Sequence, residues 1–272
     1  MTGSINRWQL NESSAKAYER YLVPLFFAPG AQFLIELAAL KGGEQVLDVA
    51  CGTGIVARTA AQRVGNHGTV IGLDLNEDML EVAHTTSSNI QSHIEWRKGD
   101  VKEIPFQDSS FNVVFCQQGL QFFPDKLAAL LEIQRVLKVN CRFALSAMRP
   151  IKHNPSYAIL AEALERHVGT DAGVMMRSPF ISLNTEELRD LILAAGFQDL
   201  RILFGIRPVR YPSITEFVLR EAASSPLAKE IKSLSDDVFQ SLIRDLEMSL
   251  RDYVDDDGII FPTETYLAIA RN

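Results

Sequence analysis

The alternation of short β-branched runs with amphipathic segments, which begins at Gln45, is the sequence feature that most constrains the fold of this chain. The runs that predict strands in this part lie at residues 45–50, 69–75, 93–98, 112–116 and 142–148. Helices are expected between some of them, at residues 54–63, 77–85 and 124–137. Strands that alternate with helices in this way form a parallel sheet covered on both faces, so the sequence predicts a doubly wound α/β domain.

The flanking segments are expected to add helices and two further strands to this domain. Residues 13–22 and 31–40 predict two helices, separated by Pro24 and by the Pro29-Gly30 turn. A capped helix is expected to begin at Asn184 and to end at Gly196. Strands at 200–209 and 266–270 would complete a seven-stranded, mostly parallel sheet. The expected units are an N-terminal helical flap (1–40), the cofactor-binding core (41–150), a lid segment (151–183), a continuation of the core (184–210), a helical lid insertion (211–262) and the last core strand (263–272).

The composition indicates a globular protein and argues against some classes of partner. Hydrophobic residues make up 47% and charged residues 22% of the 272 positions, which is typical of a globular protein. The net charge is −7 and no long basic cluster occurs, which argues against nucleic acid as a partner. No apolar run reaches the length of a transmembrane segment and residues 1–7 lack a signal-peptide pattern, so we expect a cytoplasmic protein. A homodimer is left open.

The sequence gives no indication of a metal site. Cys51, Cys116 and Cys141 are an odd count without a CxxC pair, which favours buried reduced thiols over a zinc site or a disulfide framework. The acidic run 255–257 lacks the alternating ligands of a calcium loop. We therefore expect no bound metal.

The turn after the first expected strand carries glycines in the run Cys51-Gly52-Thr53-Gly54 and leads into a helix. Glycines here allow a ligand to approach the backbone, and the helix start offers free N–H groups. Taken alone the turn is ambiguous, because Gly52-x-Gly54-x-x-Ala57 also fits the dinucleotide fingerprint.

Acidic residues at the ends of the next two strands favour a nucleoside ligand. Asp74 ends the second strand, where its carboxylate can accept hydrogen bonds from both hydroxyls of a ribose. Asp100 follows the third strand and can accept from an adenine amino group, while the N–H of Val101 can donate to a ring nitrogen, although a surface-turn aspartate explains Asp100 as well. Met79 can pack on an adenine face or serve as an ordinary core methionine. The carboxyl ends of parallel strands share one edge, where doubly wound folds bind ligands.

Taken together, the runs from Val46 to Gly54, from Gly72 to Leu80 and from Gly99 to Phe106 resemble class I S-adenosylmethionine-dependent methyltransferases. Within them the chain is similar to the small-molecule branch that includes ubiquinone- and menaquinone-type enzymes. The resemblance covers residues 40–148 and implies a Rossmann-like methyltransferase fold, S-adenosylmethionine as the cofactor and methyl transfer to an O, C or N atom of a small, partly apolar molecule.

The resemblance also implies roles for individual residues. Asp48, Gly52 and Gly54 would surround the methionyl part of the cofactor, Asp74 the ribose, and Asp100 with Val101 the adenine. The other expected cofactor contacts are Thr53, Leu75, Met79 and Gln117, the last of these close to the sulfonium. One departure concerns the turn after the helix that ends near Leu137, where the family's Pro-Gly-Gly is replaced by Val139-Asn140-Cys141.

Methyl transfer from a sulfonium often needs no catalytic residue. If the acceptor requires a general base, His153 is the expected candidate, with Tyr18, Tyr21 and His167 as alternatives that are more simply structural. Aromatic side chains in the lid, namely Phe180, Phe204, Phe217 and Phe261, suggest a partly apolar substrate, although core packing explains them equally well. Two other functions stay open: a non-catalytic S-adenosylmethionine-binding accessory protein, and an NAD(P)-dependent reductase.

Overall fold

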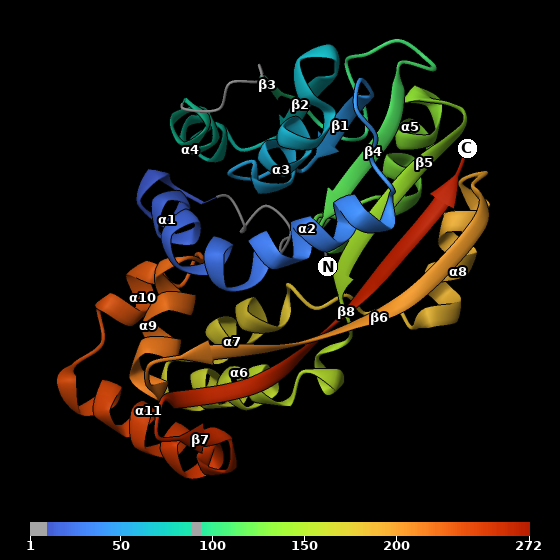
Figure 1. The fold of residues 1–272 in the computed structure, drawn as a ribbon. Helices are drawn as coiled ribbons and strands as arrows, with labels where there is room; N and C mark the ends of the chain where they lie inside the picture. The colour runs from blue at the N-terminus through green and yellow to red at the C-terminus, as the bar shows by residue number, and fades with distance from the viewer. Residues whose placement is uncertain (1–9, 89–93) are drawn as a thin grey trace.

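The computed structural model describes residues 10–88 and 94–272, which form an α/β domain with a helical lid (Figure 1). Its sheet runs in the order β3-β2-β1-β4-β5-β8-β6, and the short β7 pairs with β8. The strands are β1 Gln45–Val49, β2 Thr69–Asp74, β3 Ile94–Lys98, β4 Phe111–Gln117, β5 Leu137–Met148, β6 Gln198–Tyr211, β7 Val254–Asp255 and β8 Gly258–Arg271. The first five are parallel and β8 runs antiparallel between β5 and β6, so the predicted seven-stranded, mostly parallel sheet is confirmed. His93, the expected first residue of the third strand, lies outside the described residues, as do residues 1–9 of the flap.

Helices cover both faces of the sheet, as the sequence predicts. The helices of the flap and the sheet layers are α1 Glu12–Ala17, the π-helix η2 Tyr18–Phe27, α2 Ala28–Leu37, α3 Ile55–Val64, α4 Glu77–Ser87, α5 Lys126–Val136 and α8 Thr185–Ala194. Side chains alternate along the strands, so that Val46 packs with α2 and α3 whereas Leu47 and Val49 pack with α5 and α8. The carboxyl edge of β1, β2 and β4 is left open to the flap and the lid.

The lid has a hydrophobic core of its own. It contains α6 Pro155–His167, α7 Thr170–Arg177, α9 Ile214–Ala223, α10 Ala228–Lys232 and α11 Asp236–Ser249. These helices pack around the far ends of β6 and β8, where Tyr211, Phe217 and Phe261 are fully buried. In Figure 1 the two strands run from the sheet into this group of helices.

The flap differs from its expected form. Residues 12–37 are helical throughout, and neither Pro24 nor the Pro29-Gly30 pair separates two helices. Pro24 lies inside η2, where the wider π-helical turn accommodates a residue that has no N–H to donate. Pro29 lies in the first turn of α2, a position at which proline is common because its fixed φ suits the helix.

Three other expected features are different in the structure. Residues 139–141 belong to β5, which follows α5 directly; Asn140 takes the left-handed conformation at φ +60° and donates its N–H to Asn272 O at 2.8 Å, so no separate turn is needed. β8 begins at Gly258, so the helical insertion is shorter than expected. Phe204 belongs to β6 rather than to the lid and lies half exposed beneath the Arg149 guanidinium, 4.1 Å from its ring centroid. Within the described residues, no helix is both long and apolar enough to cross a bilayer.

Candidate active site

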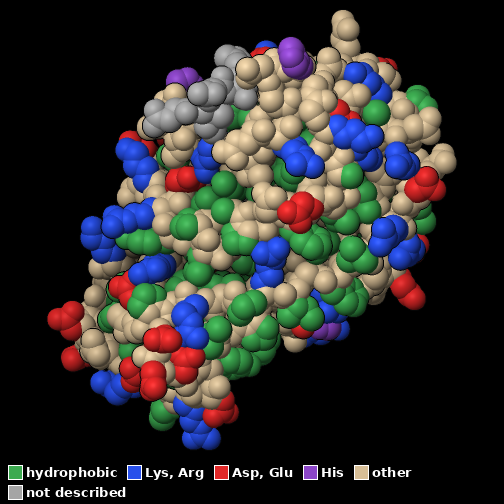
Figure 2. Space-filling model, viewed as in Figure 1, with side chains coloured by type: hydrophobic (Ala, Val, Ile, Leu, Met, Phe, Trp, Pro, Cys, Tyr) green, Lys and Arg blue, Asp and Glu red, His purple; other side chains and the backbone are tan. Residues whose placement is uncertain are grey.

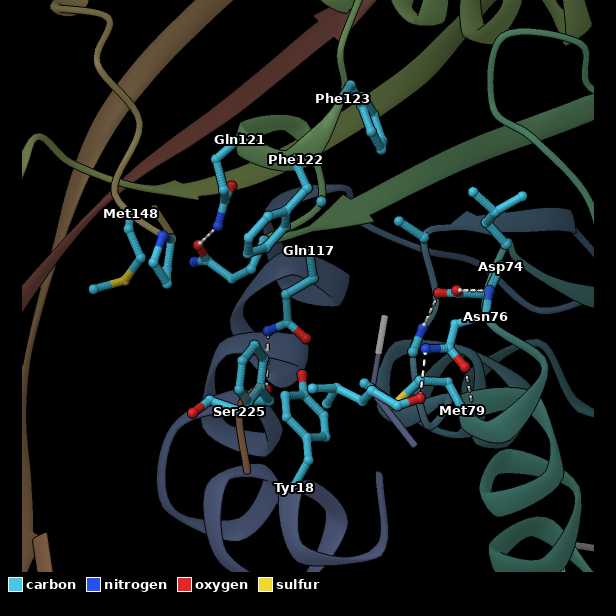
Figure 3. A pocket seen from close by; sticks show the side chains of 18 of the residues that line it. Tyr18, Asp74, Asn76, Met79, Gln117, Gln121, Phe122, Phe123, Met148 and Ser225 are labelled. Carbon is cyan, nitrogen blue, oxygen red and sulfur yellow. Dashed lines mark hydrogen bonds between the residues drawn. The ribbon is translucent and has the colours of Figure 1, made fainter. Parts of the chain in front are cut away.

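A cavity of about 470 Å³ lies where the carboxyl edge of the sheet meets the flap and the lid (Figure 3). This volume falls within the usual range of small-molecule sites, about 300–1,000 Å³. Asp74, Asn76 and Met79 lie toward one end, whereas Met148 and Ser225 lie toward the other, and Gln117 and Tyr18 lie between them. The cavity therefore has a sheet end and a lid end, and we describe them in turn.

The sheet end is organised by Asp74 at the end of β2. Its Oδ2 accepts the N–H of Gly52 at 2.7 Å, and its Oδ1 accepts the N–H of Asn76 at 2.8 Å. Burial raises the pKa of this carboxyl, and the backbone donors oppose the shift. Asn76 is itself fixed, because its side chain caps α4 and donates to Leu10 O in the flap at 2.9 Å. Asp74 thus ties the glycine turn to the second strand and still presents carboxylate lone pairs to the cavity.

Asp48 lies behind the glycine turn, with Oδ2 accepting the N–H of Ala57 in the first turn of α3 at 3.0 Å. Among the described residues, Asp48 Oδ1 and Thr53 Oγ1 are buried atoms without a hydrogen-bond partner. Burial raises the pKa of Asp48 well above its ordinary value. Buried polar atoms require partners, so the unpaired atoms beneath the turn fit a ligand with a polar or cationic end. Neither residue lines the cavity as it stands.

The two glycines of the turn have different roles. Gly52 lines the cavity, and a β-carbon added to it would lie 3.9 Å from Met79 Cε. Gly54 does not line it; a β-carbon there would come within 2.1 Å of Trp96 Cη2, with φ at +83°. Trp96, on β3, also fills the space above Gly72, 2.4 Å from where a β-carbon would lie. The sequence reasoning missed this indole, and it explains Gly54 by packing rather than by ligand approach.

The remaining residues expected at the nucleoside lie together at this end. Leu75, Met79, Asp100 and Val101 all line the cavity with Asp74. Asp100 also stabilises its own turn, since its Oδ1 accepts the N–H of Lys102 at 2.9 Å, and its side chain is 42% exposed. Asp100 therefore does stabilise a surface turn, and because it also lines the cavity, contact with an adenine stays a prediction.

Gln117 and Tyr18 separate the two ends. Gln117 ends β4 and donates from Nε2 to Phe27 O in the flap at 2.9 Å. Tyr18 begins η2 and packs on the Phe27 ring, with centroids 4.7 Å apart. Burial raises the pKa of the Tyr18 phenol well above its ordinary value, which keeps it neutral.

An ion pair that sequence reasoning missed ties the flap to the glycine turn. Arg58 on α3 donates to Thr53 O at 2.7 Å and to Glu19 Oε1 of η2 at 2.7 Å, and it also contacts Thr86. Arg58 is 9% exposed. A buried guanidinium with carboxylate and carbonyl partners holds the three elements in one arrangement.

His153 does not line the cavity in this structure. Its Nε2 lies 3.3 Å from Arg149 Nη2, and burial together with the Arg149 charge lowers its pKa. His167 contacts Asp245 Oδ2 at 2.9 Å on the outer helices, and the Tyr21 ring lies under the guanidinium groups of Arg20 and Arg220. Of the four expected candidates for a general base, only Tyr18 lies on the cavity.

Known proteins match this chain in sequence and in fold. A family model described as a methyltransferase domain matches residues 46–140. The 2-phytyl-1,4-naphtoquinone methyltransferase of Synechococcus elongatus is 35% identical over 130 residues, 47% of this chain and 54% of that protein, so the match spans about half of the relative's length. The demethylmenaquinone methyltransferase of Staphylococcus aureus is 32% identical over 174 residues, 60% of this chain and 71% of that protein.

Solved structures share the fold at lower identity. A Haemonchus contortus phosphoethanolamine N-methyltransferase 2 in complex with S-adenosyl-L-methionine has a TM-score of 0.62 at 19% identity, covering 99% of this chain and 59% of that one. A methyltransferase structure from Bacillus halodurans has a TM-score of 0.58 at 24% identity, covering 89% and 97%. The unpaired atoms of Asp48 and Thr53 and the cavity-facing Gly52 and Asp74 fit S-adenosylmethionine at the sheet end.

Proposed function

Because the chain belongs to the class I S-adenosylmethionine-dependent methyltransferases, in the branch with the menaquinone-type enzymes, we propose that it transfers a methyl group to a small, partly apolar molecule. The observation that carries this proposal is a single cavity with two chemically different ends. The sheet end presents acids and backbone groups suited to a nucleoside, whereas the lid end is walled by Met148, Met176 and Phe180. The second end suits an apolar acceptor.

At the sheet end, Asp74 would accept hydrogen bonds from the ribose hydroxyls, and Asp100 with the Val101 N–H would bind the adenine. Leu75 and Met79 would pack against this nucleoside. Asp48, Gly52 and Thr53 would hold the methionyl end, with Gly54 supporting the turn by its fit against Trp96. These assignments are supported by the position of each residue on the cavity or directly beneath it.

When bound, S-adenosylmethionine supplies an electrophilic methyl group. The chain's own contribution is alignment and exclusion of water. Gln117 and Tyr18, fixed by Phe27 O and the Phe27 ring, would form the boundary at which the acceptor meets the methyl group. The acceptor's nucleophilic atom would be aligned here by the lid.

A small-molecule partner also agrees with the surface. The net charge is −7, and on the face shown in Figure 2 Lys and Arg side chains are interspersed with Asp and Glu. This face therefore lacks the basic stripe that a phosphate backbone requires. A homodimer and a cytoplasmic location stay predictions.

Calorimetry separates this proposal from the reductase, and a turnover assay separates it from the accessory protein. S-adenosylhomocysteine should bind, whereas NADH and NADPH should not, because Asp74 and Asp100 line one end of the cavity and together suit a single nucleoside. Labelled S-adenosylmethionine should then transfer its methyl group to one or more members of a panel of phenols, hydroquinones, amines and carboxylates. NADH binding as tight as that of S-adenosylhomocysteine would contradict the proposal, and cofactor binding without turnover across the panel would favour the accessory protein.

A further inference from the structure

Among the described residues, the lid end of the cavity contains one buried carboxyl, that of Glu221 at the C-terminal end of α9. Glu221 is 9% exposed and lines the cavity. Two buried phenols donate to it, Tyr157 from α6 at 3.0 Å and Tyr211 from β6 at 2.5 Å. Both donate to the same oxygen, Oε1.

Burying the Glu221 carboxyl lowers the stability of the fold. A buried carboxylate loses its hydration, and no Lys, Arg or His in the described part of the chain forms an ion pair with Glu221. Burial raises its pKa, and the two phenols only partly offset that shift. An apolar residue at position 221 would avoid this desolvation cost. Because both tyrosines donate to Oε1, the other carboxyl oxygen, Oε2, can accept a hydrogen bond from another partner.

The surroundings of Glu221 point toward a ligand. Ser224, one turn after it, also lines the cavity, and its Oγ is buried without a hydrogen-bond partner among the described residues. Met148, Met176 and Phe180 make the rest of this wall apolar. A few fixed polar groups in an apolar wall are what orients a small ligand.

We propose that Glu221 orients the methyl acceptor by accepting a hydrogen bond from an acceptor hydroxyl on Oε2, with Tyr157 and Tyr211 as positioning residues that fix the carboxyl. The inference rests on the proposed function, since it assigns the acceptor to the lid end. A hydroxyl suits the site better than an ammonium group. It can donate to the ionised carboxylate and accept from the protonated acid, whereas an ammonium group needs the carboxyl ionised despite its burial.

The two phenols come from α6 and β6, so the carboxyl on α9 is held by two other regular elements, of which α6 is distant in the sequence. Ligand groups held on rigid elements discriminate more sharply than groups on loops. Glu221 should therefore determine which acceptors bind, while leaving cofactor affinity unchanged.

The test measures acceptor binding to the full chain saturated with S-adenosylhomocysteine, at about pH 8. The probes are 1-naphthol, 1-methoxynaphthalene, which has the same rings and no donor, and 1-naphthylmethylamine, which is cationic. We expect 1-naphthol to bind about tenfold or more tightly than the methyl ether, the scale of one hydrogen bond to a charged group. Equal binding of the two, or preference for the amine, would overturn the proposal.

The variants Glu221→Ala and Glu221→Gln should each reduce the preference for 1-naphthol over the ether to about twofold or less. The amide keeps the shape of the side chain and an oxygen for the phenols, but it offers N–H groups to either probe, so it guards against misfolding of the alanine variant. Glu230→Gln, at an exposed position on α10, is the matched control and should keep the full preference. An undiminished preference in Glu221→Gln would refute the role.

Cofactor binding distinguishes a failure of the proposed methyltransferase function from a failure of the role proposed for Glu221. S-adenosylhomocysteine should bind wild type and every variant within about twofold, because Asp74 and Glu221 lie at opposite ends. Failure of wild type to bind it would remove the proposed function itself. Normal cofactor binding with unchanged acceptor preference in the Glu221 variants would remove only the inference.

Discussion

Replacing Asp74 with alanine should weaken the cofactor site and the fold together. The carboxylate accepts the N–H groups of Gly52 and Asn76 at 2.7 and 2.8 Å, and Asn76 is buried. Each donor left without its acceptor costs about 1–3 kcal/mol, so the free energy of unfolding should fall by about 2–4 kcal/mol, allowing for access of water to Gly52. Loss of the ribose contacts should weaken binding of S-adenosylhomocysteine by about 1.5–3 kcal/mol, roughly 10- to 150-fold.

The two effects are measured separately. Urea unfolding gives the stability of the Asp74→Ala variant, and calorimetry at a temperature where it stays folded gives the affinity. Asp74→Asn should lie between the variant and wild type, because an amide has one acceptor oxygen for the two N–H groups. Glu81→Ala, at an exposed site on α4, is the control for loss of an acid nearby. If Asp74→Ala loses stability but binds S-adenosylhomocysteine as tightly as wild type does, Asp74 only ties the turn, and the ribose assignment is wrong.

Three further predictions concern packing, the flap and pH. Gly54→Ala should cost about 1–3 kcal/mol in unfolding free energy beyond the roughly 1–2 kcal/mol that a left-handed backbone costs a residue with a β-carbon, because the new β-carbon would overlap Trp96. A urea titration that shows only the backbone cost would contradict the packing role. Arg58→Met should destabilise by about 3 kcal/mol by leaving the facing carboxylate of η2 unpaired, and should increase amide exchange in η2; an unchanged melting temperature would refute this. Burial raises the pKa of Glu221, so above about pH 4 the folded state binds more protons than the unfolded state. The contribution of this residue to the free energy of unfolding should therefore fall as the pH rises toward its folded pKa. The free energy of unfolding of Glu221→Gln minus that of wild type should accordingly rise over the same pH range, and a difference that does not change with pH would contradict the prediction.

The sheet and the nucleoside end were predictable because local signals and topology agree there. Strands rich in β-branched residues, each followed by a glycine turn or an acid, bring Gly52, Asp74 and Asp100 to one edge whatever the details of packing. The boundaries of the helices in the flap were less predictable. The proline signal at Pro24 was overridden because a π-helix absorbs a missing N–H, which a 3.6-residue period does not anticipate.

The Glu221 carboxyl at the lid end was missed, although the sequence contains a signal for it. Within α9, Phe217, Val218 and Glu221 fall on one face at helical spacing, and all three are buried. A carboxyl on the apolar face of an amphipathic helix is unusual enough to require a buried partner. The partners Tyr157 and Tyr211 come from other elements, and only the fold brings them within reach.

The long pair β6 and β8 has a consequence for exchanging acceptor specificity between relatives. The strands pair without interruption from Arg201 with Ile269, beside β5, to Tyr211 with Ile259 inside the lid core. Replacing the helices of the lid alone would cut two strands whose register spans both cores, and a slip of one residue would turn Tyr211 and Phe261 away from the lid interior. A chimera should therefore be spliced where β6 and β8 leave the sheet layers, carrying both strand ends as a unit. The lid is thus an extension of the sheet rather than a module attached by linkers, and changing side chains such as those of α9 is a less disruptive way to alter acceptor specificity than replacing the whole lid.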